Sequence, residues 1–342
     1  MNRPAASAIK SSVPGAVTAR RIAIAVAILA LFAVPYVITQ VYYVNIASQV
    51  LLYAVFALGL NVLVGYAGLV SLGHAGLFGV AAYVDAYLLA AGHGHAVAIL
   101  AALVAALVAT AGFAALALRA TGISFIMITL ALGEIIWGLA YRWISITGGD
   151  NGISVSTRPE PFGLSLDSPR AFYDATLVIF LIAVAAVAIF VRSPFGAALA
   201  GTRDQPRRMN ALGFHVWMIR FWAFMFSGLL TAVAGILFVY YTEFISPQAL
   251  ALTASAEGLL MVISGGAGTL LGPVVGAALV VIVKNVASAY ITRWNFMLGA
   301  IFVAIVVFMP EGLVPGAVRL TRSAWRARSR AKAATVIAGP QQ

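Results

Sequence analysis

The fold is decided by residues 22–84, which read IAIAVAILALFAVPYVITQVYYVNIASQVLLYAVFALGLNVLVGYAGLVSLGHAGLFGVAAYV. This stretch contains no Asp, Glu, Lys or Arg. A helix needs about 20 predominantly apolar residues to cross a hydrocarbon core about 30 Å thick. Residues 22–84 alone therefore hold enough apolar chain for about three membrane spans.

The rest of the chain has the same character, because 63% of its 342 residues are apolar and only 9% are charged. Ordinary soluble domains carry about 25% charged residues. In lipid, only helices and closed barrels pair every backbone amide. Barrel strands alternate apolar and polar side chains, whereas residues 22–30 are apolar throughout and residues 99–118 are so apart from Thr110. The sequence therefore predicts an all-α polytopic membrane protein.

Charge-poor windows mark the expected spans. Arg20 and Arg21 precede the first window, and no clear small-residue cleavage site follows it, so we interpret this segment as a retained span. The eighth window, residues 252–264, is short enough either to cross or to re-enter. We expect about ten transmembrane helices, near residues 22–43, 46–64, 68–91, 96–118, 122–141, 175–191, 216–241, 252–264, 270–288 and 294–310.

Basic residues are gathered at the ends of these spans, which orients them by the positive-inside rule. Both chain ends and the loop at 192–215 are basic, so we expect them on the cytoplasmic side, and the acidic loop at 142–174 then lies outside. Ten crossings satisfy both conditions. The chain thus divides into a mobile cytoplasmic tail at 1–20, a transmembrane domain at 21–315, and a basic cytoplasmic tail at 316–342.

Composition excludes several functions. The net charge of +11 sits at membrane edges rather than on one face, which argues against nucleic-acid binding. There is no cysteine, hence no disulfide or thiolate metal site. His74 stands alone and no carboxylate lies at ligand spacing, so we expect no metal and no cofactor. The absence of a G-x-x-x-x-G-K-[ST] motif indicates that ATP is not bound in the usual manner, so energy must come from a partner or a gradient.

Two glycine-rich segments interrupt the apolar sequence. The first runs from Gly65-Tyr66-Ala67-Gly68 through Ser71-Leu72-Gly73-His74-Ala75-Gly76 to Gly79. Small residues let helices pack closely or break where a cavity or a protein neighbour tolerates free backbone, so we interpret this segment either as tight helix packing or as lining of the translocation path. The second segment, Gly265-Gly266-Ala267-Gly268 with Gly272, has a similar pattern, but both fall on the same side of the predicted topology, so they give no inverted repeat.

Ionisable residues within spans are costly and usually face a cavity or a partner. Glu134 lies in the middle of the span at 123–140, which makes it a functional candidate or a hydrogen-bonded packing residue. Asp85 and Glu257 lie nearer to span ends, where we expect an interfacial position. His74 is expected to be a hydrogen-bonded packing histidine rather than a ligand.

A polar turn, Thr147-Gly148-Gly149-Asp150-Asn151-Gly152, closes the fifth span on the expected outer side. It is either a plain connector or a docking edge for an external substrate carrier. The candidate docking residues are Thr147, Gly148, Asp150 and Asn151.

The loop between the sixth and seventh spans carries helix signals. Residues 202–206 read TRDQP, which favours a helix start, and Gly213 favours a stop. About two turns fit between them, with Met209 and Leu212 on one face and the arginines at 207–208 elsewhere. Such a helix either lays its apolar face in a partner's groove or rests as a basic loop on anionic lipid.

The motifs in their order resemble the LivM-type permeases of branched-chain amino acid ABC importers. The resemblance covers roughly residues 46–315. Its motifs are Gly59-Leu60-Asn61-Val62-Leu63-Val64-Gly65-Tyr66-Ala67-Gly68, Ser71-Leu72-Gly73-His74-Ala75, Thr147-Gly148-Gly149-Asp150-Asn151-Gly152, Ser193-Pro194-Phe195-Gly196, Ala211-Leu212-Gly213, Phe244-Ile245-Ser246-Pro247 and Gly265-Gly266-Ala267-Gly268-Thr269-Leu270-Leu271-Gly272-Pro273.

This resemblance implies a fold like that of the type II ABC importers, with 21–315 as the permease domain in a bacterial inner membrane. It also implies four kinds of contact: a second, LivH-type permease, two cytoplasmic ATPases that bind ATP, a periplasmic binding protein and membrane lipid. The chain itself would be a transport subunit and not an enzyme. The family's coupling helix maps onto 203–213 here, with contact residues Arg203, Asp204, Arg207, Met209, Ala211, Leu212 and Gly213.

One departure from the family concerns this coupling helix. The family commonly has an acidic, Ala-rich run after its Arg-Asp or Arg-Glu pair, whereas this chain has Gln205-Pro206-Arg207-Arg208-Met209-Asn210. We therefore expect the fit of this helix to the groove of its ATPase partner to differ from that of other family members. The implied substrate is a branched-chain, apolar amino acid, and relatives that import urea, amides or aromatic acids leave the substrate open.

The sequence leads us to expect alternating access, in which polar groups near the path touch the solute. Burial and composition point to Asn61, Ser71, His74 and Glu134 for this position. A proton-coupled secondary transporter that uses Glu134, with or without His74, as a proton relay is an alternative. An intramembrane enzyme would need a cluster of catalytic groups at one depth, and the chain offers little for that.

Overall fold

The computed structural model describes residues 26, 29–37, 40–155, 166, 168–290, 294–308, 312–316 and 319. The expected tails at 1–20 and 316–342 lie almost wholly outside these residues. The described elements are α2 (Val41–Asn61), η1 (Val62–Ala67, a π-helix), α3 (His74–Ala90), α4 (His95–Ala117), α5 (Ile123–Arg142), α6 (Ile144–Thr147), η2 (Gly149–Asn151), β1 (Ile153–Ser154), α7 (Pro169–Arg192), α8 (Pro194–Asp204), α9 (Pro206–Ala211), α10 (Val216–Thr242), β2 (Phe244–Ile245), η4 (Pro247–Leu250), α11 (Leu252–Gly265), α12 (Gly272–Tyr290) and α13 (Trp294–Phe308).

Five helical segments in the described part are long and apolar enough to cross a membrane. They are Val41–Ala67, α4, α5, α7 and α10. Helices α3, α11 and the first part of α12 are apolar but shorter. The prediction of a mostly helical, multi-pass membrane protein is confirmed, and the count of about ten crossings stays a prediction.

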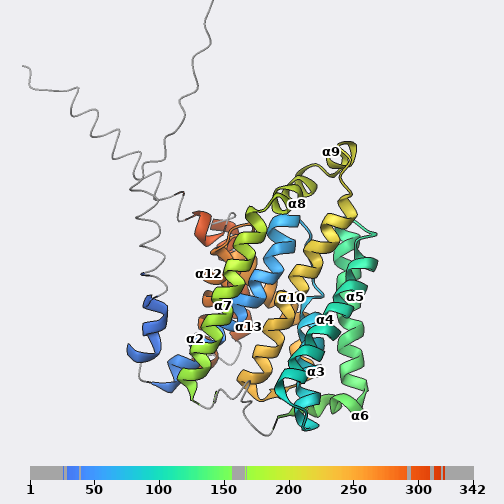
Figure 1. Cartoon of the computed structure of the whole chain (residues 1–342). Helices are drawn as coiled ribbons and strands as arrows, with labels where there is room; N and C mark the ends of the chain where they lie inside the picture. Colours follow the sequence, from blue (N-terminus) through green and yellow to red (C-terminus); the bar gives the residue numbers. More distant parts are fainter. Residues whose placement is uncertain are drawn as a thin grey trace, which may run out of the picture.

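Helices pack side by side as a bundle, with α8 and α9 across one end and α6 at the other (Figure 1). We call these the α8 end and the α6 end. In the most apolar window of Val41–Ala67, 78% of residues are buried, and for α10 the value is 67%. For α4, α5 and α7 it is only 22–28%. Thus α2 and α10 form the centre, and α4, α5 and α7 present apolar faces outward, as expected for lipid contact.

One predicted boundary is wrong. The expected break between the first two spans, at 43–46, lies inside α2, which begins at Val41 after Gln40. Residues 41–50 read VYYVNIASQV, without Gly or Pro, so no residue there stops a helix.

The first glycine-rich segment both breaks a helix and packs closely. α2 continues as the π-helix η1 to Ala67, and α3 starts only at His74. Residues 68–73 between them are not helical. Gly68 has φ +69°, a conformation that favours glycine. A side chain at Gly73 would meet the Thr129 carbonyl on α5. The segment therefore packs closely against its neighbours, and its place along the translocation path stays a prediction.

A second break separates α11 from α12, where residues 266–271 form a turn. α11 has 14 residues, and a helix of that length spans only about 21 Å. At the α6 end the chain also forms one small antiparallel pairing, in which Ile153 of β1 faces Ile245 of β2. This pairing joins the polar turn after α5 to the segment after α10.

Candidate functional site

A buried chain of hydrogen bonds centres on His74 at the start of α3. Ser227 on α10 donates from Oγ to the Gly59 carbonyl at 2.6 Å, and its Oγ lies 2.9 Å from His74 Nε2. Because the hydroxyl hydrogen of Ser227 is donated to the Gly59 carbonyl, Ser227 Oγ accepts a hydrogen bond from His74 Nε2–H. His74 Nδ1 then accepts from Ser71 Oγ, 2.9 Å away. The expectation of a hydrogen-bonded packing histidine is confirmed, since both ring nitrogens are engaged.

Asn61, at the end of α2, holds the turn between α11 and α12. Its Nδ2 donates to the Thr269 carbonyl and its Oδ1 accepts from the Gly268 N–H, both at 2.9 Å. The side chain is fully buried. Gly65 of the first glycine-rich segment packs against Gly268 of the second, a contact that the sequence alone did not suggest.

Glu134 on α5 is half-buried. In the described part of the chain, no hydrogen bond or ion pair of this carboxylate is recorded. Its neighbour Gly133 packs against Gly73. The functional role predicted for Glu134 stays a prediction.

Asp85 is enclosed by the helix bundle, and its expected position near the membrane interface stays a prediction. It is 0% exposed in α3, and neither carboxylate oxygen has a hydrogen-bond partner among the described residues. α3 packs against α4, α5 and α10, so neighbouring helices rather than lipid headgroups surround this side chain.

A cavity of about 470 Å³ lies between α2, α3, α10, η4, α11 and α12. Its wall includes the exposed residues Gln248 and Thr253 near the α6 end and the buried residues Phe56 and Met261 farther in. The cavity is mainly apolar, with Phe78 and Phe238 as further aromatic lining. Asn61, Ser71, His74 and Glu134 do not line it, although Ala75 does.

The same cavity is lined by an ion pair between two helices. Lys284 Nζ on α12 lies 3.0 Å and 3.2 Å from the two carboxylate oxygens of Glu257 on α11. The side chains are 34% and 19% exposed, respectively. Glu257 therefore faces a partner and a cavity, and its expected position near the membrane interface stays a prediction.

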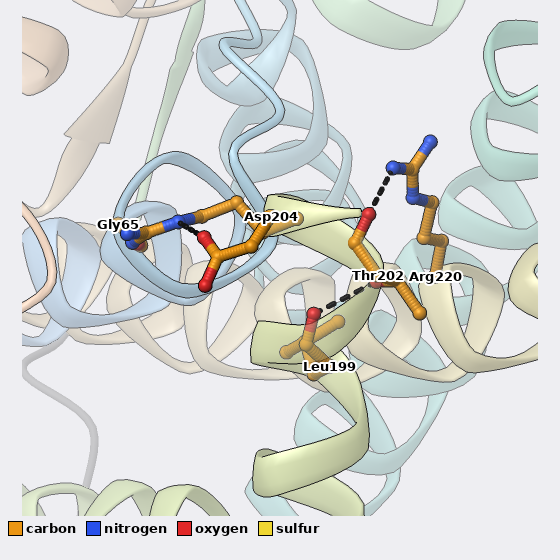
Figure 2. A network of polar contacts seen from close by, with 6 residues as sticks. Gly65, Leu199, Thr202, Asp204 and Arg220 are labelled. Carbon is orange, nitrogen blue, oxygen red and sulfur yellow. Dashed lines mark hydrogen bonds and ion pairs between the residues drawn. The ribbon is translucent and has the colours of Figure 1, made fainter. Parts of the chain in front are cut away.

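At the α8 end, the last turn of α8 is hydrogen-bonded to η1 and to α10 (Figure 2). Arg203 donates from Nη1 to the Gly65 carbonyl at 2.5 Å and from Nε to Asp204 at 3.2 Å. Arg220 of α10 donates to the Thr202 carbonyl at 2.7 Å. Gly65 packs in turn against Gly268 and Asn61. A continuous set of contacts thus runs from α8 to both helix breaks.

The helix start expected from residues 202–206 is confirmed, because α9 begins at Pro206. The coupling segment that the resemblance mapped onto 203–213 comprises the end of α8 and the whole of α9. α8 ends at Asp204 and α9 begins at Pro206, with Gln205 in a non-helical conformation between them at φ −146° and ψ 77°. Proline lacks an N–H and disfavours helical geometry in the residue before it, which explains the break. The expected stop at Gly213 is confirmed by its φ of +87°.

Met209 and Leu212, which were expected on a common face, differ in their exposure. Met209 is half-buried, with its sulfur close to Gly201 of α8, whereas Leu212 follows α9 and is 64% exposed. The reason is the short length of α9, which folds back on α8. No residue of α9 is buried. Arg207 and Ala211 are exposed too.

At the α6 end the candidate docking residues lie together in α6 and η2. Thr147 is buried, and its Oγ1 donates to the carbonyls of Ala140 and Trp143, so it holds the turn. Asp150 and Asn151 are exposed. Asp150 Oδ1 accepts from Gln248 Nε2 at 3.3 Å, so the turn touches the rim of the cavity.

Comparison with known proteins identifies the class. Residues 42–306 match the family described as branched-chain amino acid transport system / permease component. The chain belongs to this family.

Individual relatives agree with this family. The chain is 31% identical over 301 residues to the LivM permease proteins of the high-affinity branched-chain amino acid transport systems of Salmonella typhimurium and Escherichia coli. These alignments cover 80% of this chain and 70% of each relative. The LivH permease protein of Escherichia coli is 23% identical over 297 residues, 77% of this chain and 91% of LivH. No solved structure matches the chain.

Sequence reasoning missed the Glu257–Lys284 pair. The available signal was a lysine within the apolar window at 270–288, opposite in charge to the glutamate within the window at 252–264. Two opposite charges in adjacent spans favour pairing, because an unpaired charge in lipid is costly.

Proposed function

We propose that this chain is a transmembrane permease subunit of an ATP-driven ABC importer for branched-chain, apolar amino acids. It would have the type II fold with ten crossings, in a bacterial inner membrane with both termini cytoplasmic. Membership of the permease family over residues 42–306 carries this proposal. The chain would be a transport subunit, not an enzyme, and its partner subunits would bind and hydrolyse ATP.

The α8 end is the proposed ATPase contact. Exposed apolar side chains there include Leu212, Phe214 and Trp217. The exposed arginines at 207–208 lie beside them. An apolar patch with a basic rim suits a groove on a soluble partner better than it suits water. Contacts of Arg203 with Gly65 would carry movement of that partner to the helix breaks.

The α6 end is the proposed dock for a periplasmic binding protein. Exposed Asp150 and Asn151 offer polar contacts, while Thr147 and Gly148 shape the turn. The hydrogen bond from Gln248 to Asp150 places this turn beside the cavity. A solute released there would have a short way into the bundle.

Transport would proceed by alternating access between this permease and a second one. The similarity to both LivM and LivH proteins supports a pair of related permeases. Glu134 is proposed to lie near the path. Asn61, Ser71 and His74 would act by fixing the helix breaks beside it, since their polar atoms are used in internal hydrogen bonds.

The substrate class has alternatives, namely urea, amides and aromatic acids. A proton-coupled secondary transporter using Glu134 is a further alternative. A relay through His74 is disfavoured, because both of its ring nitrogens already have partners.

The test is co-purification in detergent. With the genome-neighbouring ATPases co-expressed, we expect them to purify with the chain and to hydrolyse ATP faster when binding protein and leucine are added. Leu212→Glu should abolish the association, because it puts a charge into the apolar contact. His93→Glu, on an exposed loop between α3 and α4, is the matched control and should not. Co-purification that is insensitive to Leu212→Glu, or absent for the unchanged chain, would contradict the proposal.

A further inference from the structure

We infer that the Glu257–Lys284 pair is the solute-binding centre of this chain and that it takes zwitterionic α-amino acids with apolar side chains. This inference rests on the proposed import function and names the site and the chemistry that would select the solute.

The position of the pair is the first argument. Glu257 and Lys284 lie in apolar helices, where a charged side chain is costly. Replacing a buried ion pair by apolar residues of similar size often leaves a protein equally stable or more stable. Helix packing alone is therefore a weak explanation for an ion pair at this position. Both side chains line a cavity of about 470 Å³, within the range of about 300–1,000 Å³ usual for small-molecule sites.

The chemistry of the pair is the second argument. A zwitterion carries one ammonium and one carboxylate, so it can insert between the two side chains, with its ammonium on Glu257 and its carboxylate on Lys284. The exchange keeps every charge paired and brings no net charge into the site. An anionic or cationic solute would leave one charge unpaired, which is costly away from water.

The rest of the wall suits the remainder of such a solute. Phe56, Phe78 and Phe238 offer an apolar surface to a branched side chain, and burying that side chain away from water favours binding. Thr253 and Gln248 add hydrogen-bonding groups toward the α6 end. Urea and simple amides have neither the charges to insert in the pair nor a side chain for the aromatic wall.

The absence of cysteine makes a direct test possible. Thr253→Cys places one thiol in the cavity lining, and His93→Cys places one on an exposed loop that does not line the cavity. In the purified permease complex, we expect millimolar leucine to slow maleimide labelling at position 253 but not at position 93. Urea and acetamide should not slow it at either position.

The pair is then removed in the Thr253→Cys background. Glu257→Gln with Lys284→Met keeps size and removes both charges, and leucine protection should weaken at least about tenfold, the loss of roughly 1.4 kcal/mol. Unchanged leucine protection in this variant, or equal protection by urea, overturns the inference. If this variant fails to assemble, Glu257→Asp serves instead, because it keeps the charge but shifts the carboxylate. Protection should again weaken, and unchanged protection overturns the inference.

ATP-driven leucine uptake by the assembled transporter separates this inference from the proposed function. Uptake that requires the ATPases but is unaffected by removal of the pair leaves the function standing and overturns the site. Absence of ATP-driven uptake with the unchanged chain overturns the function, while labelling protection still decides whether the pair binds a zwitterion.

Discussion

Asn61 and Gly268, 207 positions apart in the chain, are joined by a hydrogen bond of 2.9 Å from the Gly268 N–H to Asn61 Oδ1. The bond ties the end of α2 to the turn between α11 and α12. Together with the bond from Asn61 to the Thr269 carbonyl, it pairs backbone groups that the broken helix leaves without helical partners. One amide side chain therefore pairs two backbone groups of the break at 266–271 and fixes this break to the end of α2.

We predict that Asn61→Leu destabilises the permease strongly. The substitution keeps approximate size but leaves the Gly268 N–H and Thr269 carbonyl unpaired, at about 1–3 kcal/mol for each group. Thermal unfolding of the purified protein in detergent should show a clear fall in midpoint. Asn151→Leu, at an exposed position, is the control and should unfold near the unchanged value. Equal unfolding midpoints for Asn61→Leu and Asn151→Leu would contradict a stabilising role for the Asn61 hydrogen bonds.

We predict that Gly65→Ala prevents correct packing of the α8 end. An added Cβ would collide with the Gly268 backbone and with Asn61. Gly112→Ala in α4 makes the matched control, because nothing lies within 4 Å of its added carbon, and helix propensity favours it by about 0.5–1 kcal/mol. Yield of monodisperse protein after detergent extraction measures the difference. Equal yields would show that the contact is not tight in the membrane.

The sequence predicts the helical membrane fold well, because apolar windows and charge placement act locally. The prediction fails where a contact between separate helices overrides a local sequence pattern. The signals in residues 202–206 predict a helix start at Pro206, where α9 begins, but they do not predict that the Met209 side chain packs against Gly201 of α8. The different exposure of Met209 and Leu212 depends on this contact and was not predictable from spacing.

Most of the candidate site depends on contacts between distant segments, which one sequence does not reveal. The hydrogen bond from Asn61 to Thr269 and the hydrogen bond from Arg203 to Gly65 each join residues more than 130 positions apart. Asp85 shows the same limit, because its distance from the span end suggests an interface while packing of neighbouring helices buries it. The Glu257–Lys284 pair is the exception, since opposite charges in adjacent apolar spans are visible in the sequence.

We predict that Arg203→Met uncouples ATP hydrolysis from transport. It removes the bond to the Gly65 carbonyl, and a hydrogen bond from a charged donor contributes about 1.5–3 kcal/mol, so transport per ATP should fall by about tenfold. ATPase co-purification should persist, because the exposed α9 surface is unchanged. Leucine uptake and hydrolysis are measured in the same proteoliposomes, with Arg208→Met as a control for lost charge. A parallel fall in uptake and hydrolysis would point to lost docking instead.

We predict that Asp150→Ala weakens stimulation by the binding protein without changing basal hydrolysis. The substitution removes an exposed charge and the bond to Gln248 at the cavity rim, both remote from the α8 end. The measurement is ATPase rate against binding-protein concentration in nanodiscs, where half-maximal stimulation should need more binding protein. Ser154→Ala, also exposed at the α6 end, is the control. A changed basal rate would place the effect on folding rather than docking.

Glu134 decides between the two energy sources proposed for transport. An ionised carboxylate in a span costs about 2.5–3.5 kcal/mol, which favours a functional reason for a residue that is half-buried in α5. We predict that Glu134→Gln slows leucine uptake while ATP dependence is kept, since the amide keeps the shape but loses the charge beside the path. Uptake is measured in proteoliposomes with ATP, with and without a protonophore. Uptake that collapses with the protonophore in the unchanged protein would favour the proton-coupled alternative. Unaltered uptake and assembly in Glu134→Gln would remove this residue from the path, and the helix breaks held by Asn61 and His74 would then be the remaining polar features beside it.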